Sequence, residues 1–322
     1  MNTVGFPISR KENENRRTLL PEDIKNIDTP KYIFLEKGYG LNLGYTDQEY
    51  INLGVNIVSR DEVLTKDIIC DPKIGDADYI DKLKCQTIFG WVHAVQNRGI
   101  TDILIKNELT AFAWEEMFDR GRHTFYRNNE IAGEAAIIHA FLLHGLFPYE
   151  TKVAILGRGN IARGAMKILN YMGANISVYD RKTEQLFREE LFNFDVIVNA
   201  ITWDTTRKDH IIYQNDLKYL KKDTLIIDIS CDKNGAIETS VPTTIENPTY
   251  VQNGITHYVV DHTPSLFYKT ISKSLSSIVS YYINFLINNK VNDVLNNALI
   301  VKKGVIIDSK INDFQNRAFQ VK

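Results

Sequence analysis

The chain has 322 residues, of which 44% are hydrophobic and 24% charged, and its formal net charge is −2. These values are ordinary for a globular protein, and the length is sufficient for two domains. The dispersed lysines and arginines argue against a nucleic-acid partner, which requires a basic surface. The three cysteines, Cys70, Cys85 and Cys231, are too widely spaced for a metal or disulfide motif. We find no signal peptide and no apolar run of membrane-spanning length, and therefore expect a cytoplasmic protein without a membrane contact or a bound metal.

The first part of the chain alternates short apolar runs with polar or helical stretches. Strands are expected at residues 3–6, 31–36, 55–58, 68–70, 87–92 and 109–113. Helices are expected after Pro21, at 46–53 with Thr46 as the N-cap, and at 97–107. Strands that alternate with helices in this way predict a parallel α/β sheet.

Three candidate site residues follow predicted strands of this region. Arg16 lies in the charged segment 9–18 after the first strand, Lys73 follows the fourth strand and His93 follows the fifth. Taken singly, none of the three indicates a site. A charged run is usually a solvated face, a lysine is usually a surface residue, and a histidine is usually a hydrogen-bonded core residue. Open parallel sheets, however, bind ligands at the carboxyl ends of their strands. The three segments can therefore bring a guanidinium, an ammonium and an imidazole to one crevice.

The next element is a long helix, expected from Asn128 or Asn129 to about Leu143. Gly145 and Pro148 mark its end. Its apolar residues cover most of its circumference, so the helix is predicted to be buried and to join two domains.

The clearest motif begins with a short apolar strand, 153–156, and continues as Gly157-Arg158-Gly159-Asn160-Ile161-Ala162. Gly157 permits a tight turn, Gly159 lets the backbone approach a pyrophosphate, and Ala162 allows the helix to pack closely on the strand. A second strand, 175–179, ends at Asp180, where the ribose of an adenosine would lie. This order of a strand, a glycine loop, a helix, a second strand and an acidic residue predicts a Rossmann dinucleotide-binding domain.

The preference between NAD and NADP remains open from these residues alone. Asp180 favours an unphosphorylated ribose because a carboxylate repels a 2′-phosphate, whereas Arg158, Arg181 and Lys182 could pair with one. Asp232 is placed on the nucleotide or ribose side of the binding cleft, with a structural role as the alternative. The candidate cofactor-binding residues are Gly157, Arg158, Gly159, Asn160, Ile161, Ala162, Asp180, Arg181, Lys182 and Asp232.

The rest of the chain completes the two predicted domains. Strands are expected at 195–200, 225–229 and 255–260, and a second long helix begins at Pro264. One face of this helix carries an apolar stripe that predicts core or subunit-interface contacts: Phe267, Ile271, Leu275, Ile278, Tyr282 and Phe285. We therefore predict a substrate-binding and catalytic domain at 1–130, completed by about 285–322, and a Rossmann domain at 131–284 that includes the linking helices.

Blocks spaced along nearly the whole chain resemble the alanine dehydrogenase/pyridine nucleotide transhydrogenase family. They are Gly5-Phe-Pro-Ile-Ser-Arg-Lys-Glu-Asn-Glu-Asn-Arg-Arg-Thr-Leu-Leu-Pro21, 67–73, 89–93, 109–115, 130–133, 227–232, 247–250 and 257–258. The chain is most similar to small cytoplasmic bacterial members that join pyruvate to the side-chain amine of ornithine and reduce the imine with NADPH. The resemblance implies NADP(H) as the cofactor and a homotetramer. It also implies that Arg16 holds the keto-acid carboxylate, that Lys73 contacts the same substrate and that His93 is the acid/base.

Forming a secondary amine from a keto acid requires the groups that these residues offer. An arginine clamps the carboxylate, a cation polarises the keto oxygen, and a hydride donor reduces the imine. Histidine suits the proton transfers because its pKa lies near the working pH.

Several features depart from typical alanine dehydrogenases. The chain is shorter, Arg158 stands inside the glycine loop, Arg17 duplicates the cation of Arg16, and His262-Thr-Pro-Ser265 replaces an asparagine-containing turn. These departures argue against ammonia as the amine donor and against strict use of NAD. Lysine is an alternative to ornithine as the donor.

Three other functions remain possible from the sequence: an alanine dehydrogenase, a saccharopine-dehydrogenase-like enzyme, and a nucleotide sensor without turnover.

Overall fold

The computed structural model describes residues 1–204, 207–232 and 235–317, and the chain divides into two compact units. Unit 1 comprises Met1–Phe125 and Tyr268–Lys322, and unit 2 comprises Tyr126–Phe267. Both units contain a mainly parallel sheet, so the predicted α/β class is confirmed. Across the described ranges, no helix combines the length and apolarity needed to cross a membrane.

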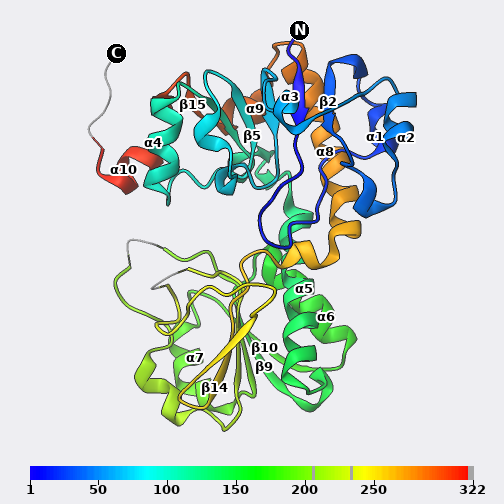
Figure 1. Cartoon of the computed structure of the whole chain (residues 1–322). Helices are drawn as coiled ribbons and strands as arrows, with labels where there is room; N and C mark the ends of the chain where they lie inside the picture. The colour runs from blue at the N-terminus through cyan, green and yellow to red at the C-terminus, as the bar shows by residue number, and fades with distance from the viewer. Residues whose placement is uncertain (205–206, 233–234, 318–322) are drawn as a thin grey trace. The chain divides into compact units, whose positions relative to one another are not determined.

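Unit 1 is built on an eight-stranded sheet (Figure 1). In sheet order its strands are β16 (Val305–Ile306), β15 (Leu299–Lys302), β6 (Thr110–Ala113), β5 (Thr87–Gly90), β4 (Ile68–Cys70), β1 (Val4–Phe6), β2 (Ile33–Glu36) and β3 (Asn56–Val58). The six strands β1 to β6 are parallel, and β15 pairs antiparallel with β6. Every residue of β1 and β4 is buried, and so are the last three residues of β5. Burial on both faces of the sheet explains why these strands are continuous apolar runs.

The helices of unit 1 follow the start signals of the sequence. α2 (Asp47–Asn52) begins with the capping box of Thr46 and Glu49, and Asn97 caps α4 (Arg98–Lys106). Unit 1 also contains the α-helices α1 (Pro21–Ile24), α3 (Arg60–Val63), α8 (Tyr268–Ile287), α9 (Asp293–Ala298) and α10 (Ser309–Gln315), and a hairpin of β7 (Phe118–Asp119) and β8 (Arg122–His123).

The chain returns to unit 1 at the start of α8, earlier than the position near 285 that we expected from the sequence. α8 belongs to unit 1 because its serines anchor the segment that follows β1. Ser272 and Ser276 each accept a backbone N–H bond of 2.8 Å from residues 17–20. Part of the predicted apolar stripe is core in this unit: Ile271, Leu275 and Tyr282 are buried.

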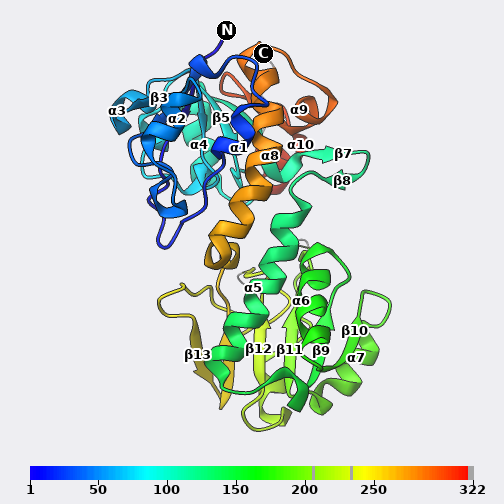
Figure 2. The same cartoon turned by 90° about the vertical axis from the view of Figure 1, so that its right-hand side faces the viewer.

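Unit 2 has the expected Rossmann arrangement. In sheet order its strands are β10 (Asn175–Tyr179), β9 (Lys152–Leu156), β11 (Val196–Asn199), β12 (Leu225–Asp228), β14 (Ile255–Tyr258) and β13 (Thr249–Gln252). All pairs are parallel except β13 with β14. α5 (Tyr126–His144) and α6 (Asn160–Tyr171) lie side by side along the sheet in Figures 1 and 2, and α7 (Glu184–Glu190) follows β10.

The prediction that α5 is buried all round was wrong for one face. Ala136 and Ala140 are fully buried in the core that α5 shares with α6 and the sheet, but Leu142 is 76% exposed. The helix packs along one side only, which the even distribution of its apolar residues could not indicate. It also begins at Tyr126, slightly before the expected asparagines.

Candidate active-site residues in the two units

The carboxyl ends of three unit 1 strands carry the candidate residues named from the sequence. Arg16 lies in the segment after β1, Lys73 after β4 and His93 after β5. β1 and β4 are neighbours, and the strand order runs outward from them in opposite directions. Ligands of open α/β sheets bind at such a switch point. The fold therefore brings all three residues to one end of this sheet.

Arg16 is buried and is held by Glu14, a residue that the sequence analysis did not single out. The guanidinium donates from Nε to Oε1 at 2.8 Å and from Nη2 to Oε2 at 2.5 Å, and it lies 5.2 Å from the ring centroid of Trp91. Burial acts to raise the pKa of Glu14, but Arg16 outweighs burial and Lys73 adds to its effect, so the pKa is lowered. Glu14 is therefore an anion that fixes the planar fork of Arg16.

Arg17, the second arginine of the segment, is bonded mainly to the backbone. Its Nε donates to the Tyr39 carbonyl at 2.5 Å and its Nη1 to the Arg16 carbonyl at 2.9 Å. The guanidinium also lies 5.5 Å from the centroid of the Tyr39 ring. These contacts hold the segment in place.

Lys73 is positioned through its backbone by a buried carboxylate. Asp71 accepts the Lys73 N–H at 2.8 Å and the Tyr79 hydroxyl at 2.7 Å. Burial raises the pKa of Asp71 to about 6, although both of these bonds act in the opposite direction. Lys73 itself is 8% exposed, so its ammonium lies in a largely desolvated position.

Asp76 links Lys73 to a second lysine that the sequence analysis did not single out. Its Oδ2 lies 2.9 Å from Lys11 Nζ and 3.5 Å from Lys73 Nζ. Burial acts to raise the pKa of Asp76, but Lys73 and Lys11 outweigh it and His93 adds to their effect, so the pKa is lowered. The anionic carboxylate therefore holds two ammonium groups at the same end of the sheet.

His93 has a left-handed backbone conformation, with φ of 54°, and its N–H donates to Glu115 Oε1 at 2.6 Å. The residue is partly accessible to solvent, yet burial by the surrounding protein lowers the pKa of His93 from its ordinary value. Lys73 and Lys11 act in the same direction, while Glu115 and Asp76 oppose them. The imidazole is therefore neutral at neutral pH and can accept a proton.

The glycine loop of unit 2 lies where the strand order of its sheet reverses, between β9 and β11. Gly157 has a φ of 114°, and a Cβ there would stand 2.7 Å from the Ala200 carbonyl oxygen, so only glycine fits. A Cβ on Gly159 would meet nothing within 4 Å. Among the residues that the structure describes, no side chain caps the N-terminus of α6, whose first turn is Asn160-Ile161-Ala162. Open space before uncapped backbone N–H groups fits a dinucleotide pyrophosphate.

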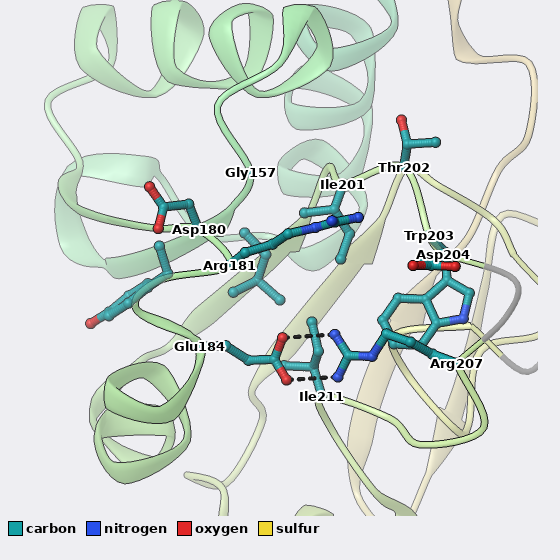
Figure 3. A pocket seen from close by; sticks show the side chains of 12 residues that line it. Gly157, Asp180, Arg181, Glu184, Ile201, Thr202, Trp203, Asp204, Arg207 and Ile211 are labelled. Atoms are coloured by element: carbon teal, nitrogen blue, oxygen red, sulfur yellow. Dashed lines mark hydrogen bonds and ion pairs between the residues drawn. The ribbon is translucent and has the colours of Figure 1, made fainter.

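A cavity of about 220 Å³ adjoins this loop. Its lining includes Asp180, Arg181, Trp203 and Arg207, and in Figure 3 the Arg181 side chain extends from beside Asp180 toward Ile201. Asp180 Oδ2 accepts a bond of 2.8 Å from Arg158 Nε. Lys182 does not line the cavity, although its N–H donates to Asp180 at 3.0 Å. Trp203 and Arg207 were not predicted, because no sequence pattern connects them with the glycines.

Asp232 lies outside the lining of this cavity. Burial and the neighbouring Asp228 raise its pKa to about 6. Asp228 is itself buried at the end of β12, where it accepts a bond of 2.9 Å from Asn199 and another from Ser240. Asp228 ends β12 and Asp232 follows it at the carboxyl edge of the sheet.

Several other histidines are bonded inside unit 2. His139 lies 3.0 Å from the Tyr258 hydroxyl, His257 lies 2.8 Å from Thr239 Oγ1, and His210 contacts a backbone carbonyl at 2.7 Å. Within residues 1–204, 207–232 and 235–317 no group of three or more His, Cys, Asp or Glu residues is arranged to hold a metal ion.

Both halves of the chain match one family of proteins. Residues 5–129 match the description alanine dehydrogenase/PNT, N-terminal domain, and residues 181–312 match the C-terminal domain of the same family. The N(5)-(carboxyethyl)ornithine synthase of Lactococcus lactis subsp. lactis is 37% identical over 289 residues, covering 84% of this chain and 91% of that protein. The protein of the same name from Clostridium botulinum is 34% identical over 296 residues, covering 84% and 90%.

The fold also matches a solved structure. An L-alanine dehydrogenase that is 21% identical superposes with a TM-score of 0.81, covering 98% of this chain and 99% of that chain. At this identity the likeness concerns the fold, and the sequence relatives carry the comparison of function.

Proposed function

The chain belongs to the alanine dehydrogenase/pyridine nucleotide transhydrogenase family, and from this premise we propose that it condenses pyruvate with the side-chain amine of L-ornithine. The product is N(5)-(carboxyethyl)ornithine, and NADPH is the reductant. The observation that carries the proposal is the assembly of Arg16, Lys73 and His93 at the switch point of unit 1. The names of the relatives at 34% and 37% identity support the choice of ornithine.

The residues of unit 1 have complementary roles in this reaction. Arg16, fixed by Glu14, binds the carboxylate of pyruvate. Lys73 polarises the keto oxygen, which prepares the carbonyl carbon for attack by the neutral amine. His93, neutral in the resting enzyme, accepts the proton that the attacking amine loses and returns it as the carbinolamine releases water. The products of these steps are an imine and one water molecule.

The residues of unit 2 hold the nicotinamide cofactor in the same proposal. Gly157, Gly159 and the first turn of α6 receive the pyrophosphate, and Asp180 lies at the ribose. Arg181 and Arg158 pair with the 2′-phosphate. For Arg181, this role is supported by its place in the cavity lining and by the absence of an ion-pair partner among the described residues. When bound, NADPH supplies the hydride that reduces the imine carbon. Asp232 lies on the nucleotide side, and Lys182 adds charge from outside the cavity lining.

The experiment follows NADPH oxidation with pyruvate and, in turn, ornithine, lysine and ammonium, and identifies the product by mass spectrometry. We expect ornithine to be the fastest donor at equal concentration and lysine to be slower. One methylene changes selection by about 1–3 kcal/mol, so lysine should retain some activity. If ammonium equals or exceeds ornithine, the enzyme is an alanine dehydrogenase. Binding of NADPH without oxidation in any mixture would make the chain a nucleotide sensor.

We further propose that the enzyme is a cytoplasmic homotetramer. Light scattering of the purified protein tests the assembly, and a monomer or dimer at micromolar concentration would overturn it.

A further inference from the structure

Arg207 is surrounded by carboxylates on both edges of its guanidinium. Nη1 and Nη2 donate to Glu184 at 2.9 and 2.8 Å, and Nε and Nη2 donate to Asp209 at 2.8 and 2.7 Å. These bonds use both edges of the planar fork, the geometry that makes Arg–carboxylate pairs specific. Arg207 therefore lies at the cavity as a rigid plane whose charge is already neutralised.

One face of this plane rests on an indole ring. The Arg207 guanidinium carbon lies 4.7 Å from the ring centroid of Trp203, and Figure 3 shows the guanidinium between that ring and Glu184. Trp203 is 7% exposed and packs in the same apolar cluster as Leu156 and Ile211. Arg207 is more exposed, with 27% of its side chain accessible, so the guanidinium has surface left to cover in the cavity that both residues line.

The arginines at this cavity differ in how far they are already paired. Arg181 lines the cavity and has no ion-pair partner among the described residues. Arg158 does not line it, and donates one bond of 2.8 Å to Asp180, which does. Arg207, by contrast, faces two carboxylates, so that an added phosphate there would meet net negative charge. A flat, uncharged group suits the Arg207 plane better, because an arginine plane supported by an aromatic ring stacks on a base.

We propose that Trp203 and Arg207 form the adenine-binding wall of the cavity, and that Arg207 acts there as a stacking plane and not as a phosphate ligand. The ligand class is an adenine nucleotide, with or without a 2′-phosphate. The inference rests on the proposed binding of a nicotinamide dinucleotide by unit 2, and it assigns the pairing with a 2′-phosphate to Arg181 and Arg158, not to Arg207.

The test compares the full-length protein with Arg207→Lys, which keeps the charge and loses the plane. Isothermal titration measures the affinity for 5′-AMP and for adenosine 2′,5′-bisphosphate. We expect Arg207→Lys to weaken both ligands by the same factor, roughly five- to fiftyfold from the loss of stacking. Arg181→Ala is the matched control, and it should weaken the bisphosphate alone.

A second variant protects the test against a folding defect. Trp203→Phe keeps an aromatic support, and circular dichroism and thermal melting check that both variants are folded. We expect Trp203→Phe to bind both nucleotides within a few-fold of the parent. The proposal is overturned if folded Arg207→Lys binds both ligands as the parent does, or if it loses affinity for the bisphosphate only. If the parent protein is folded but binds neither nucleotide, the proposed cofactor function fails together with this inference. If the parent binds both nucleotides and only the expected effect of Arg207→Lys is missing, this inference fails alone.

Discussion

At the scale of single residues, the candidate site of unit 1 is a set of paired charges. Arg16 is matched by Glu14, and Lys11 and Lys73 share Asp76. Pairing offsets part of the desolvation cost of these buried ions and keeps them charged. His93, whose pKa is lowered from its ordinary value, is neutral at neutral pH. In the proposed reaction, the paired charges bind the substrate and His93 exchanges the protons.

We expect His93→Asn to reduce turnover by roughly 10²–10⁴, the usual contribution of general acid–base catalysis. Because its pKa is lowered, His93 becomes protonated only below the ordinary value of 6.5, and the parent rate should fall as the pH decreases through that range. The variant should lack this limb of the pH profile and should bind NADPH within a few-fold of the parent. His144→Asn, at the end of α5 in unit 2, is the control. A variant with nearly the parent rate would make Lys73 the first candidate for the proton transfer.

Asp71 predicts a pH dependence of stability. Its pKa is about 6 in the folded chain against an ordinary 3.8, so the folded state binds the proton more tightly. The stability from this group is therefore present at low pH and is lost as the pH rises through 6, by on the order of 3 kcal/mol at most. Asp71→Asn removes this dependence. Urea unfolding at several pH values between 4.5 and 7.5 measures the free energy of unfolding of both proteins. The free energy of the variant should rise relative to that of the parent as the pH increases, and an unchanged difference would refute the assignment.

At the scale of elements, close contacts between loops place the side chains. Gly75 donates its N–H to the Trp91 carbonyl at 3.0 Å, and a Cβ on Gly75 would stand 2.2 Å from the Val92 carbonyl oxygen. This contact joins the loop that carries Lys73 to the loop that carries His93. The sequence around Gly75 gives no sign of this contact, because the residues that it meets are far away along the chain.

We expect Gly75→Ala to lower stability by about 1–3 kcal/mol, the usual cost of inserting a methyl group into a packed contact. The shift of the two loops should also reduce turnover, since misplacement by about 1 Å can lower a rate a hundredfold. Gly99→Ala in α4 is the control, because a Cβ there meets only Asn97 Oδ1 at 3.4 Å. Urea unfolding and the NADPH oxidation assay check both effects. Equal behaviour of the two variants would show that the Gly75 contact does not matter.

Sequence patterns predicted those features that depend on local signals or on the common direction of parallel strands. Thr46 was recognisable as a cap, and Arg16 and Lys73 could be placed at one sheet edge because their strands are parallel. Contacts between distant loops carried no such signal. Asp76 bonds Lys11 across 65 residues, and Arg207 bonds Glu184 across 23. Most of α8 was also assigned to unit 2, because an apolar stripe does not indicate which core it joins.

At the scale of the whole molecule, the two units differ in how the chain builds them. Unit 2 is one continuous segment, Tyr126–Phe267, whereas unit 1 needs both ends of the chain. Unit 2 also has its own buried core, formed by α5, α6 and its sheet. A continuous segment with its own core can fold by itself. The proposed ligands divide in the same way, with keto-acid residues in unit 1 and dinucleotide residues in unit 2.

We therefore expect residues 126–267, produced alone, to fold cooperatively and to bind NADPH within about tenfold of the full chain. Ligand at a hundred times its Kd should stabilise the fragment by about 2.7 kcal/mol, because only the folded state binds it. The fragment should not oxidise NADPH with pyruvate and ornithine, since Arg16, Lys73 and His93 all belong to unit 1. Thermal melting with and without NADPH measures the first effect, and the oxidation assay the second. Gly157→Ala in the fragment is the control that should abolish the stabilisation, because its φ of 114° and the Ala200 carbonyl exclude a side chain. A folded fragment that NADPH does not stabilise would mean that unit 2 lacks a complete dinucleotide site.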